Sequence, residues 1–510
     1  MKKLSPFITL LLLAANTFAQ HKAPVTPQSN VQFKNMLGVN AFEWDFLNPN
    51  DATILSGDKM DIIESFGGVR HYLDWQKIEP KRGSFTFNPA HDGGWNYDII
   101  YQRCKQDGID MLVDIKTCPA WLLESYPQNL RDGENIPMPF GAKRDAPASY
   151  IEQAKAGFQF AARYGSNKNV GPALVTVDSK PRWTGDNVNT VKIGLGTVKY
   201  VECDNERDKW WKGEKAQQSA EEYAANMSAF YDGDKGRLGK GVGVKNADPN
   251  MMVVMAGLSK PETAYVQRMI NWCKLHRGYK RDGSVNLCFD VINFHYYNNA
   301  PNINRGVAPE LSKAAELADG FVRLGKAYHL PVWVTETGYD INPGSPQRAI
   351  AIGNKSVLIT QADWIMRTAL LYARHGISKV FFYELNDDNI ANPTQYSSSG
   401  LADKGKRRPA ADYILQAKNL LGNYTYSGTI SKYPLVDVYR NGSKTIYALM
   451  LPSESGSTFA ATLNLGNASK AIEYQFNSGS NDMIKTPVSA PGHSLKINVG
   501  ETPVFVEKGD

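Results

Sequence analysis

The sequence predicts an α/β fold: a (β/α)8 barrel followed by a small C-terminal all-β sandwich domain. Between residues 36 and 421, short apolar runs rich in β-branched residues alternate with longer amphipathic stretches, which is typical of a barrel of parallel strands and helices. After residue 421 the pattern changes to short alternating runs separated by turn residues, as in a β-sandwich. A chain of 510 residues also exceeds the usual size of one domain.

The barrel domain is predicted to span residues 30–421. Eight runs are predicted as its strands, at residues 37–42, 69–73, 111–116, 199–203, 251–256, 291–296, 332–336 and 380–383. The helical stretches lie at residues 58–66, 97–106, 150–164, 220–231, 263–275, 311–328, 356–375 and 410–421. Two connections are long, and long connections in a compact domain are often functional. We expect residues 119–148 over the barrel mouth, whereas residues 165–197 start on the opposite side and are expected to be an embellishment.

The sandwich domain is predicted to span residues 422–510. Its candidate strands are residues 436–440, 445–451, 459–465, 471–476, 495–499 and 504–506, separated by Asn-Gly, Gly-Ser and Pro-Gly turns. The domain could have a binding role of its own, but packing against the barrel is the favoured interpretation.

The N-terminus has the pattern of a signal peptide. Lys2 and Lys3 precede an apolar run at residues 7–15, and a small residue, Ala19, offers a cleavage site. We therefore predict a signal peptide at residues 1–19 and a secreted or periplasmic protein. No other apolar run reaches spanning length, so membrane insertion is not expected. A net charge of +6, lower still without the two lysines, does not argue for nucleic acid.

The five cysteines follow no zinc-binding pattern, and no metal or other cofactor is predicted. Cys273 and Cys288 are candidates for a disulfide. Cys203 precedes Glu206 by three residues, but no histidine is near it in the sequence, so we interpret it as a packing residue.

Two glutamates are the strongest functional signal. Glu206 follows the fourth predicted strand, in VKYVECDNE, and Glu336 ends the seventh, in LPVWVTETGY. In a barrel the C-terminal ends of all strands meet at one face, where active sites lie. Two carboxyl groups about 5 Å apart are the general acid/base and the nucleophile of retaining glycosidases. We therefore predict that Glu206 and Glu336 are catalytic.

Other polar and aromatic residues fall near the same strand ends. Asn205 could hydrogen-bond a sugar hydroxyl next to the reacting carbon. His295 and Tyr297 share a face of the sixth strand, where a tyrosine hydroxyl beside the nucleophile could orient it and hold its charge. The alternative is that His295 and Tyr297 are a satisfied pair in the core. Arg70, in the second strand, needs a carboxylate partner if it is buried, and Glu336 is the partner we expect.

Three further residues complete the predicted substrate-binding set. Trp121 and Trp210 could form platforms for sugar rings. Glu384, after the eighth strand, could bind hydroxyl groups or instead pair with Arg70.

With these residues the chain resembles the retaining glycoside hydrolases of clan A over residues 37–421. The resemblance rests on Arg70, on Asn205-Glu206, on His295 and Tyr297, and on Glu336. It is most similar to family 39-like members, with further similarity to families 42 and 5, although Arg207 stands where many members have proline. The resemblance implies Glu206 as acid/base, Glu336 as nucleophile and no cofactor.

The sequence therefore predicts a secreted retaining glycosidase that cleaves β-linked poly- or oligosaccharides. Two alternatives remain open: a non-catalytic carbohydrate-binding protein on a barrel scaffold, and a transglycosylase. The sugar, the choice between endo and exo action and the oligomeric state are not predicted.

Overall fold

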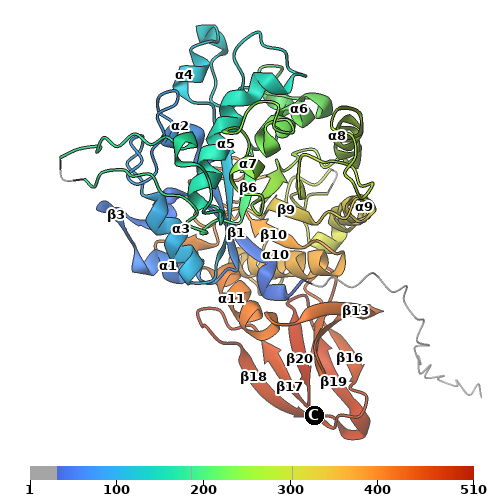
Figure 1. Cartoon of the computed structure of the whole chain (residues 1–510). Helices are drawn as coiled ribbons and strands as arrows, with labels where there is room; N and C mark the ends of the chain where they lie inside the picture. Colours follow the sequence, from blue (N-terminus) through green and yellow to red (C-terminus); the bar gives the residue numbers. More distant parts are fainter. Residues whose placement is uncertain (1–30, 185, 301, 510) are drawn as a thin grey trace, which may run out of the picture.

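The computed structural model describes residues 31–184, 186–300 and 302–509. They form a barrel with a β domain below it in the view of Figure 1. The predicted signal peptide lies outside the described residues.

The barrel consists of eight parallel strands in the order β7-β6-β5-β4-β1-β10-β9-β8. Bridges between Val254 and Val291 and between Leu258 and Phe294 join β7 to β8, so the ring of strands closes. The predicted (β/α)8 fold is thereby confirmed, and every predicted strand end agrees to within one residue. The strands are β1 Leu37–Ala41, β4 Gly68–Asp74, β5 Asp110–Lys116, β6 Tyr200–Cys203, β7 Met252–Met255, β8 Ile292–His295, β9 Val332–Thr337 and β10 Lys379–Phe382.

Helices surround the strands, and side-chain caps begin several of them. Ser219 and Glu222 form a capping box at the start of α6, and Ser356 caps α10; such caps satisfy backbone N–H groups that lack partners in the first turn. Among the described residues, the helices of seven residues or more are α1 Gly57–Ile63, α3 Tyr97–Gln106, α5 Ile151–Tyr164, α6 Ala220–Asp232, α8 Thr263–His276, α9 Ala314–Ala327, α10 Val357–Arg374 and α11 Pro409–Leu421.

Both long connections reach the loops at the mouth of the barrel. Residues 119–148 pack against the loop that follows β6: the Ile136 N–H donates to the Lys215 carbonyl, and Lys209 pairs with Glu134. Residues 165–197 begin after the end of α5, on the face of the barrel opposite the mouth, as expected, but the segment then leaves that face. The Asp178 N–H donates to the Phe85 carbonyl at 2.7 Å, so this segment climbs to the loop after β4. It is more than an embellishment of the lower face.

The C-terminal region contains a six-stranded antiparallel sheet, β13-β14-β15-β20-β17-β18, and a two-stranded sheet, β16-β19. Two strands, β13 and β18, were not predicted, because their alternation is interrupted by Gly428 and Pro487. The strands are β13 Thr425–Lys432, β14 Leu435–Asn441, β15 Lys444–Met450, β16 Phe459–Asn464, β17 Lys470–Gln475, β18 Ile484–Ser489, β19 Ser494–Val499 and β20 Val504–Lys508.

One face of the large sheet packs against the barrel helices. Arg374 in α10 pairs with the buried Asp437 at 2.8 Å, and the rings of Tyr413 in α11 and Phe476 stack with centroids 4.1 Å apart. Residues of the sheet, among them Tyr439 and Phe505, belong to the same apolar core as the barrel. This contact agrees with the packing role favoured from the sequence.

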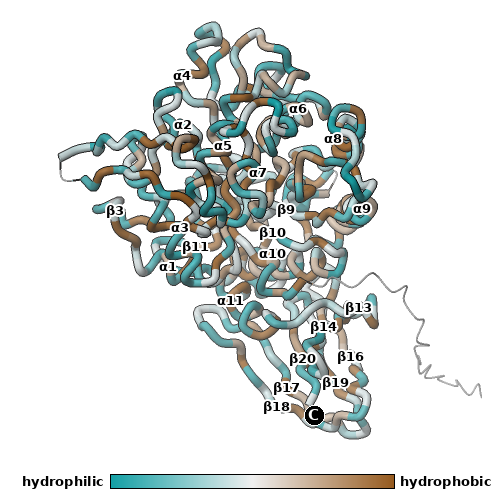
Figure 2. Tube along the Cα trace, viewed as in Figure 1, coloured by the Kyte–Doolittle hydropathy of each residue, from teal (hydrophilic) through white to brown (hydrophobic). Residues whose placement is uncertain are grey.

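Hydrophilic and hydrophobic residues are interspersed along the chain of both the barrel and the β domain (Figure 2). No described helix is long and apolar enough to cross a membrane.

All five cysteines are buried and free. The disulfide considered between Cys273 and Cys288 is not formed, although their sulfur atoms lie 3.4 Å apart.

Candidate active site

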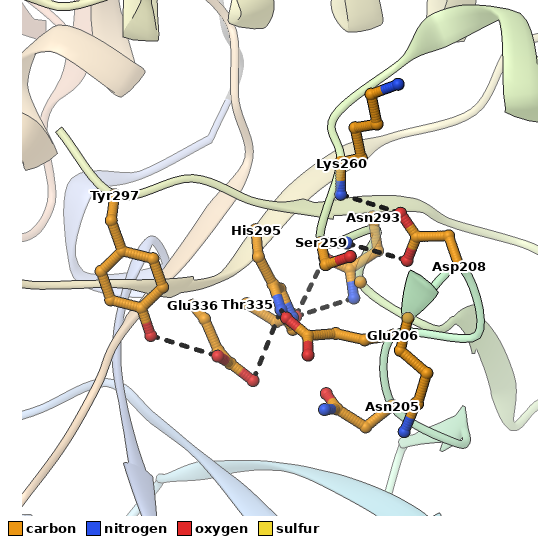
Figure 3. Close-up of polar contacts among 12 residues, drawn as sticks. Asn205, Glu206, Asp208, Ser259, Lys260, Asn293, His295, Tyr297, Thr335 and Glu336 are labelled. Carbon is orange, nitrogen blue, oxygen red and sulfur yellow. Dashed lines mark hydrogen bonds and ion pairs between the residues drawn. The ribbon is translucent and has the colours of Figure 1, made fainter. Parts of the chain in front are cut away.

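The structure brings Glu206 and Glu336 together at the C-terminal ends of β6 and β9 (Figure 3). One carboxylate oxygen from each, together with a ring nitrogen of His295, lie within 4.8 Å of one another. Glu336 is part of the fully buried strand β9. Glu206 lies in a sharp turn after β6, in which the φ values of Asp204 and Glu206 are 69° and 49°. Such left-handed residues are uncommon and concentrate at functional sites.

Glu336 accepts hydrogen bonds at both carboxylate oxygens. Arg70 Nη1 donates to Oε1 at 2.8 Å, the Tyr72 hydroxyl donates to the same oxygen, and the Tyr297 hydroxyl donates to Oε2 at 3.1 Å. Burial opposes the ionised form, but nearby His295 and Arg70 and the Tyr72 hydroxyl outweigh it and lower the pKa of Glu336. The site thus holds Glu336 as a carboxylate.

Arg70 lies at the centre of a buried network. Its guanidinium donates from Nε and Nη2 to the two oxygens of Glu202, at 2.7 and 3.1 Å, and from Nη2 to Asn205 Oδ1 at 2.9 Å. Asp114 Oδ2 lies 3.2 Å from Nη2. The predicted partnership of Arg70 with Glu336 is present, and two further carboxylates share the same cation. A bidentate contact fixes the plane of a guanidinium. Glu202 therefore holds the Arg70 guanidinium in the orientation in which Nη1 meets Glu336.

His295 links the two candidate catalytic carboxylates. Its Nδ1 lies 2.9 Å from Glu206 Oε1 and 3.5 Å from Glu336 Oε1, and its Nε2 lies 3.0 Å from Thr335 Oγ1. Burial disfavours the charged ring, but Glu336 and Glu206 outweigh burial and raise the pKa of His295. A Cβ at Gly257 would overlap the His295 ring, so glycine is required there.

Glu206 has the opposite electrostatic environment to Glu336. Burial raises its pKa, and the neighbouring Glu336 carboxylate adds to this effect, although the hydrogen bond from His295 opposes it. A pair of carboxyl groups whose pKa values are driven apart is the arrangement that separates an acid from a base or nucleophile. Glu206 is therefore suited to carry a proton, and Glu336 to act as an anion.

The other predicted substrate-binding residues lie in different surroundings. Trp210 follows Glu206 in the loop after β6 and is 66% exposed. Trp121 is half-buried, because its ring packs edge-on against Trp75 at 5.5 Å and its Nε1 donates to the Glu79 carbonyl. Its role as a sugar platform, like that of Trp210, stays a prediction.

Glu384 does not pair with Arg70, so that alternative is wrong. The side chain is 1% exposed, and Oε1 has no hydrogen-bond partner among the described residues. Burial, with nearby Asp388, Asp45 and Asp387, raises its pKa to about 10, which keeps the carboxyl group neutral. A place for Glu384 in substrate binding stays a prediction.

The site also contains residues that were not predicted, namely Tyr72, Glu202, Asp114 and Asn293. Alternation along a strand offered one signal, since Tyr72 lies two residues after Arg70 and therefore on the same face. Asn293 likewise lies two residues before His295, and its Nδ2 donates to Glu202 Oε1 at 3.0 Å. Glu202 and Asp114 carried no such signal, because an isolated acidic residue in an apolar strand has many structural explanations.

The fold is that of clan A glycoside hydrolases. A family 39 glycoside hydrolase from the gut symbiont Bacteroides cellulosilyticus WH2 superimposes with a TM-score of 0.61 over 94% of this chain and 82% of that chain, at 18% identity. A GH30 endoxylanase from Clostridium papyrosolvens C71 gives 0.54 over 95% and 98%, at 10% identity. AbfB, a family 51 α-L-arabinofuranosidase from Bifidobacterium longum, gives 0.54 over the same shares, at 12% identity. No protein-family model and no curated sequence matches the chain.

Proposed function

We propose that this protein is a secreted retaining glycoside hydrolase that cleaves β-linked poly- or oligosaccharides. The observation that carries the proposal is the pair of carboxyl groups, with oxygens within 4.8 Å and with pKa values shifted in opposite directions. Retaining enzymes have carboxyl groups about 5 Å apart, whereas inverting enzymes need roughly 6.5–9.5 Å to admit a water molecule. The similarity of fold to glycoside hydrolases supports the same reaction class, and the N-terminal pattern supports export.

In this mechanism Glu336 attacks the anomeric carbon while Glu206 gives its proton to the departing glycosidic oxygen. Arg70, Tyr72 and Tyr297 hold Glu336 ionised and aimed before the attack. Once Glu336 is esterified its negative charge is gone, so the pKa of Glu206 falls. Glu206 then removes a proton from the incoming water, whose oxygen attacks the anomeric carbon and displaces Glu336 as a carboxylate. The sugar is released with its original anomeric configuration.

The direct test is hydrolysis of a panel of β-linked polysaccharides and aryl β-glycosides by residues 20–510. Proton NMR during the first minutes reads the configuration of the released sugar, and added acceptor alcohols separate hydrolysis from transglycosylation. Release of the β-anomer supports the proposal, and initial release of the α-anomer refutes a retaining mechanism. Saturable glycan binding without any turnover would favour a carbohydrate-binding protein instead.

Replacing Tyr72 by phenylalanine is expected to shift the acidic limb of the kcat/KM profile. Activity requires Glu336 ionised and Glu206 protonated, so the profile is bell-shaped. Phenylalanine cannot donate to Glu336, whose lowered pKa then rises, and activity is lost at a higher pH than in the wild type. We expect a roughly 10- to 100-fold lower kcat/KM below the new limb, since hydrogen bonds to charged groups contribute about 1.5–3 kcal/mol.

Tyr439→Phe is the matched control for Tyr72→Phe. The Tyr439 hydroxyl is buried in the C-terminal domain and has no hydrogen-bond partner among the described residues. This variant should leave the profile unchanged. An unchanged acidic limb in Tyr72→Phe would show that the hydroxyl does not control the ionisation of Glu336.

Zinc is expected to inhibit the enzyme competitively, and EDTA is expected to restore activity without lowering that of untreated protein. Glu206, His295 and Glu336 offer donor atoms close enough for one ion, and these are of the kinds that Zn²⁺ prefers, so zinc should block both carboxylates. EDTA alone should have no effect, because Arg70 already supplies a positive charge beside Glu336. Steady-state kinetics with Zn²⁺ and Mg²⁺ check this, with Mg²⁺ as the ion that should not inhibit. Loss of activity in EDTA alone would instead require a metal in the reaction.

A further inference from the structure

Lys116 places a positive charge at the mouth of the barrel beside the candidate nucleophile. It is the last residue of β5 and is half-buried. Asp114, two residues earlier, points into the barrel toward Arg70, and alternation directs Lys116 to the same side one layer higher. Its Nζ lies 4.9 Å from the centre of the Tyr72 ring, whose hydroxyl donates to Glu336. A sugar bound at Glu336 would therefore lie near this ammonium group.

Among the described residues, Lys116 has no ion-pair or hydrogen-bond partner for Nζ. The adjacent carboxylate on the next strand, Asp74, is engaged elsewhere: it accepts from Thr117 Oγ1 at 2.7 Å and pairs with Lys77 at 3.2 Å. Asp114 lies one layer lower and pairs with Arg70. Burial and the Glu202 carboxylate raise the pKa of Asp114 against the opposing charges of Arg70 and Lys116, so Asp114 is a weak counter-ion that forms no ion pair with Lys116. The face of the Tyr72 ring is the contact that Lys116 does make.

The neighbouring cations at this end of the barrel differ from Lys116 in this respect. Lys77 pairs with Glu43 at 3.0 Å, Lys209 with Glu134 at 3.2 Å, and the buried Arg207 with Asp204 at 3.2 Å. Each of these charges is matched within the protein. Lys116 is left to be matched by a group that arrives with the substrate.

We propose that Lys116 binds an anionic substituent on the sugar that occupies the site beside Glu336, and that the natural substrate carries such a group. A uronic acid carboxylate or a sulfate ester has the required chemistry, because either forms a charge-assisted hydrogen bond with an ammonium group. This inference rests on the proposed glycosidase function and names its substrate class. A neutral sugar would leave the charge of Lys116 unmatched.

The test compares aryl β-glycosides that differ only at C6: glucoside, glucuronide and glucoside 6-sulfate, and the galacto series likewise. The wild type is expected to hydrolyse one anionic member with at least ten-fold higher kcat/KM than the neutral member. Lys116→Met should lower kcat/KM for that anionic substrate by about 100-fold and for the neutral one by less than three-fold. Lys116→Arg keeps the charge and should retain most of the preference.

Lys485→Met is the matched control, because Lys485 also lies over a tyrosine ring, 5.9 Å from the centre of Tyr474, but in the C-terminal domain. It should change neither activity. Preference for the uronide or for the sulfate decides which anion is bound. Preference for the neutral glycoside, or an equal loss on all substrates in Lys116→Met, would overturn the proposal and leave Lys116 with an electrostatic effect on Glu336 alone.

A binding experiment separates failure of this inference from failure of the proposed function. If the wild type hydrolyses no glycoside of the panel, the proposed function fails on these sugars, but calorimetry can still compare glucuronate with glucose, and galacturonate with galactose. Tighter binding of a uronate that is lost in Lys116→Met supports the anion site. Equal affinity for the charged and neutral sugars overturns it.

Discussion

Replacing Glu336 by alanine is expected to lower kcat by roughly 10⁴-fold or more, since losing a nucleophile removes the covalent route entirely. The variant should still fold. Without Glu336, the Arg70 guanidinium keeps its bidentate contact with Glu202 and its contact with Asp114, so no buried charge is left unpaired. Initial rates on the best substrate of the panel, with circular dichroism and thermal unfolding alongside, check both statements.

Glu124→Ala is the control, because Glu124 is exposed and lies in the connection after β5; its activity should equal that of the wild type. A 2-deoxy-2-fluoro glycoside with a good leaving group adds a positive result. Fluorine slows both steps and the leaving group speeds only the first, so the glycosyl-enzyme accumulates. Mass spectrometry of a digest should find the sugar on the peptide that contains Glu336. Near-normal turnover of Glu336→Ala, or a label elsewhere, would remove Glu336 from the nucleophile role.

The barrel and the position of its carboxylates could be predicted because strand periodicity and chain order carry that information. Parallel strands bring their C-terminal ends to one face, so Glu206 and Glu336 had to approach each other once β6 and β9 were correctly located. Alternation then places Tyr297 beside His295 and both near Glu336. For such residues the local pattern and the global topology specify the same place.

The supporting network was harder to predict, because it depends on which buried groups meet across the barrel. Arg70 could be expected to need a carboxylate, but the sequence offered Glu336 and Glu384 as partners, and the structure adds Glu202 and Asp114 from β6 and β5. The barrel interior places these side chains in successive layers, and only the closed ring of strands determines which of them face one another. The sequence has no local signal for such contacts.

The path of residues 165–197 was missed for a related reason. Composition marked the segment as a long connection, but its destination depends on single contacts, such as those of Asp178 with the Phe85 carbonyl and with the Ser84 hydroxyl. Asp178 offers its carboxylate to Ser84 and, across 3.7 Å, to His91. Irregular chain is positioned by such pairings rather than by periodicity, which is why its course could not be inferred from the pattern of residues.

Replacing Glu206 by alanine should have a different effect from the loss of Glu336, and the difference tests the assigned roles. With a poor leaving group, loss of the acid is expected to lower kcat/KM by about 10²–10⁴-fold. With a 2,4-dinitrophenyl leaving group, which departs without protonation, formation of the glycosyl-enzyme should remain fast. Hydrolysis of that intermediate then becomes limiting, because no base activates the water. Steady-state rates on both kinds of substrate, with a measured burst of phenolate, check this.

Azide should rescue Glu206→Ala, since a small anion that needs no base can enter the space that the carboxylate leaves and attack the intermediate. The product is expected to be the β-glycosyl azide, because two displacements at the anomeric carbon retain configuration. The matched variant Glu336→Ala lacks the nucleophile, so azide can attack only the substrate itself and should give the α-glycosyl azide. Rescue of Glu206→Ala with an α-configured product would instead identify Glu206 as the nucleophile and Glu336 as the acid/base. Absence of any rescue, in a folded variant with fast first-step chemistry, would remove Glu206 from the acid/base role.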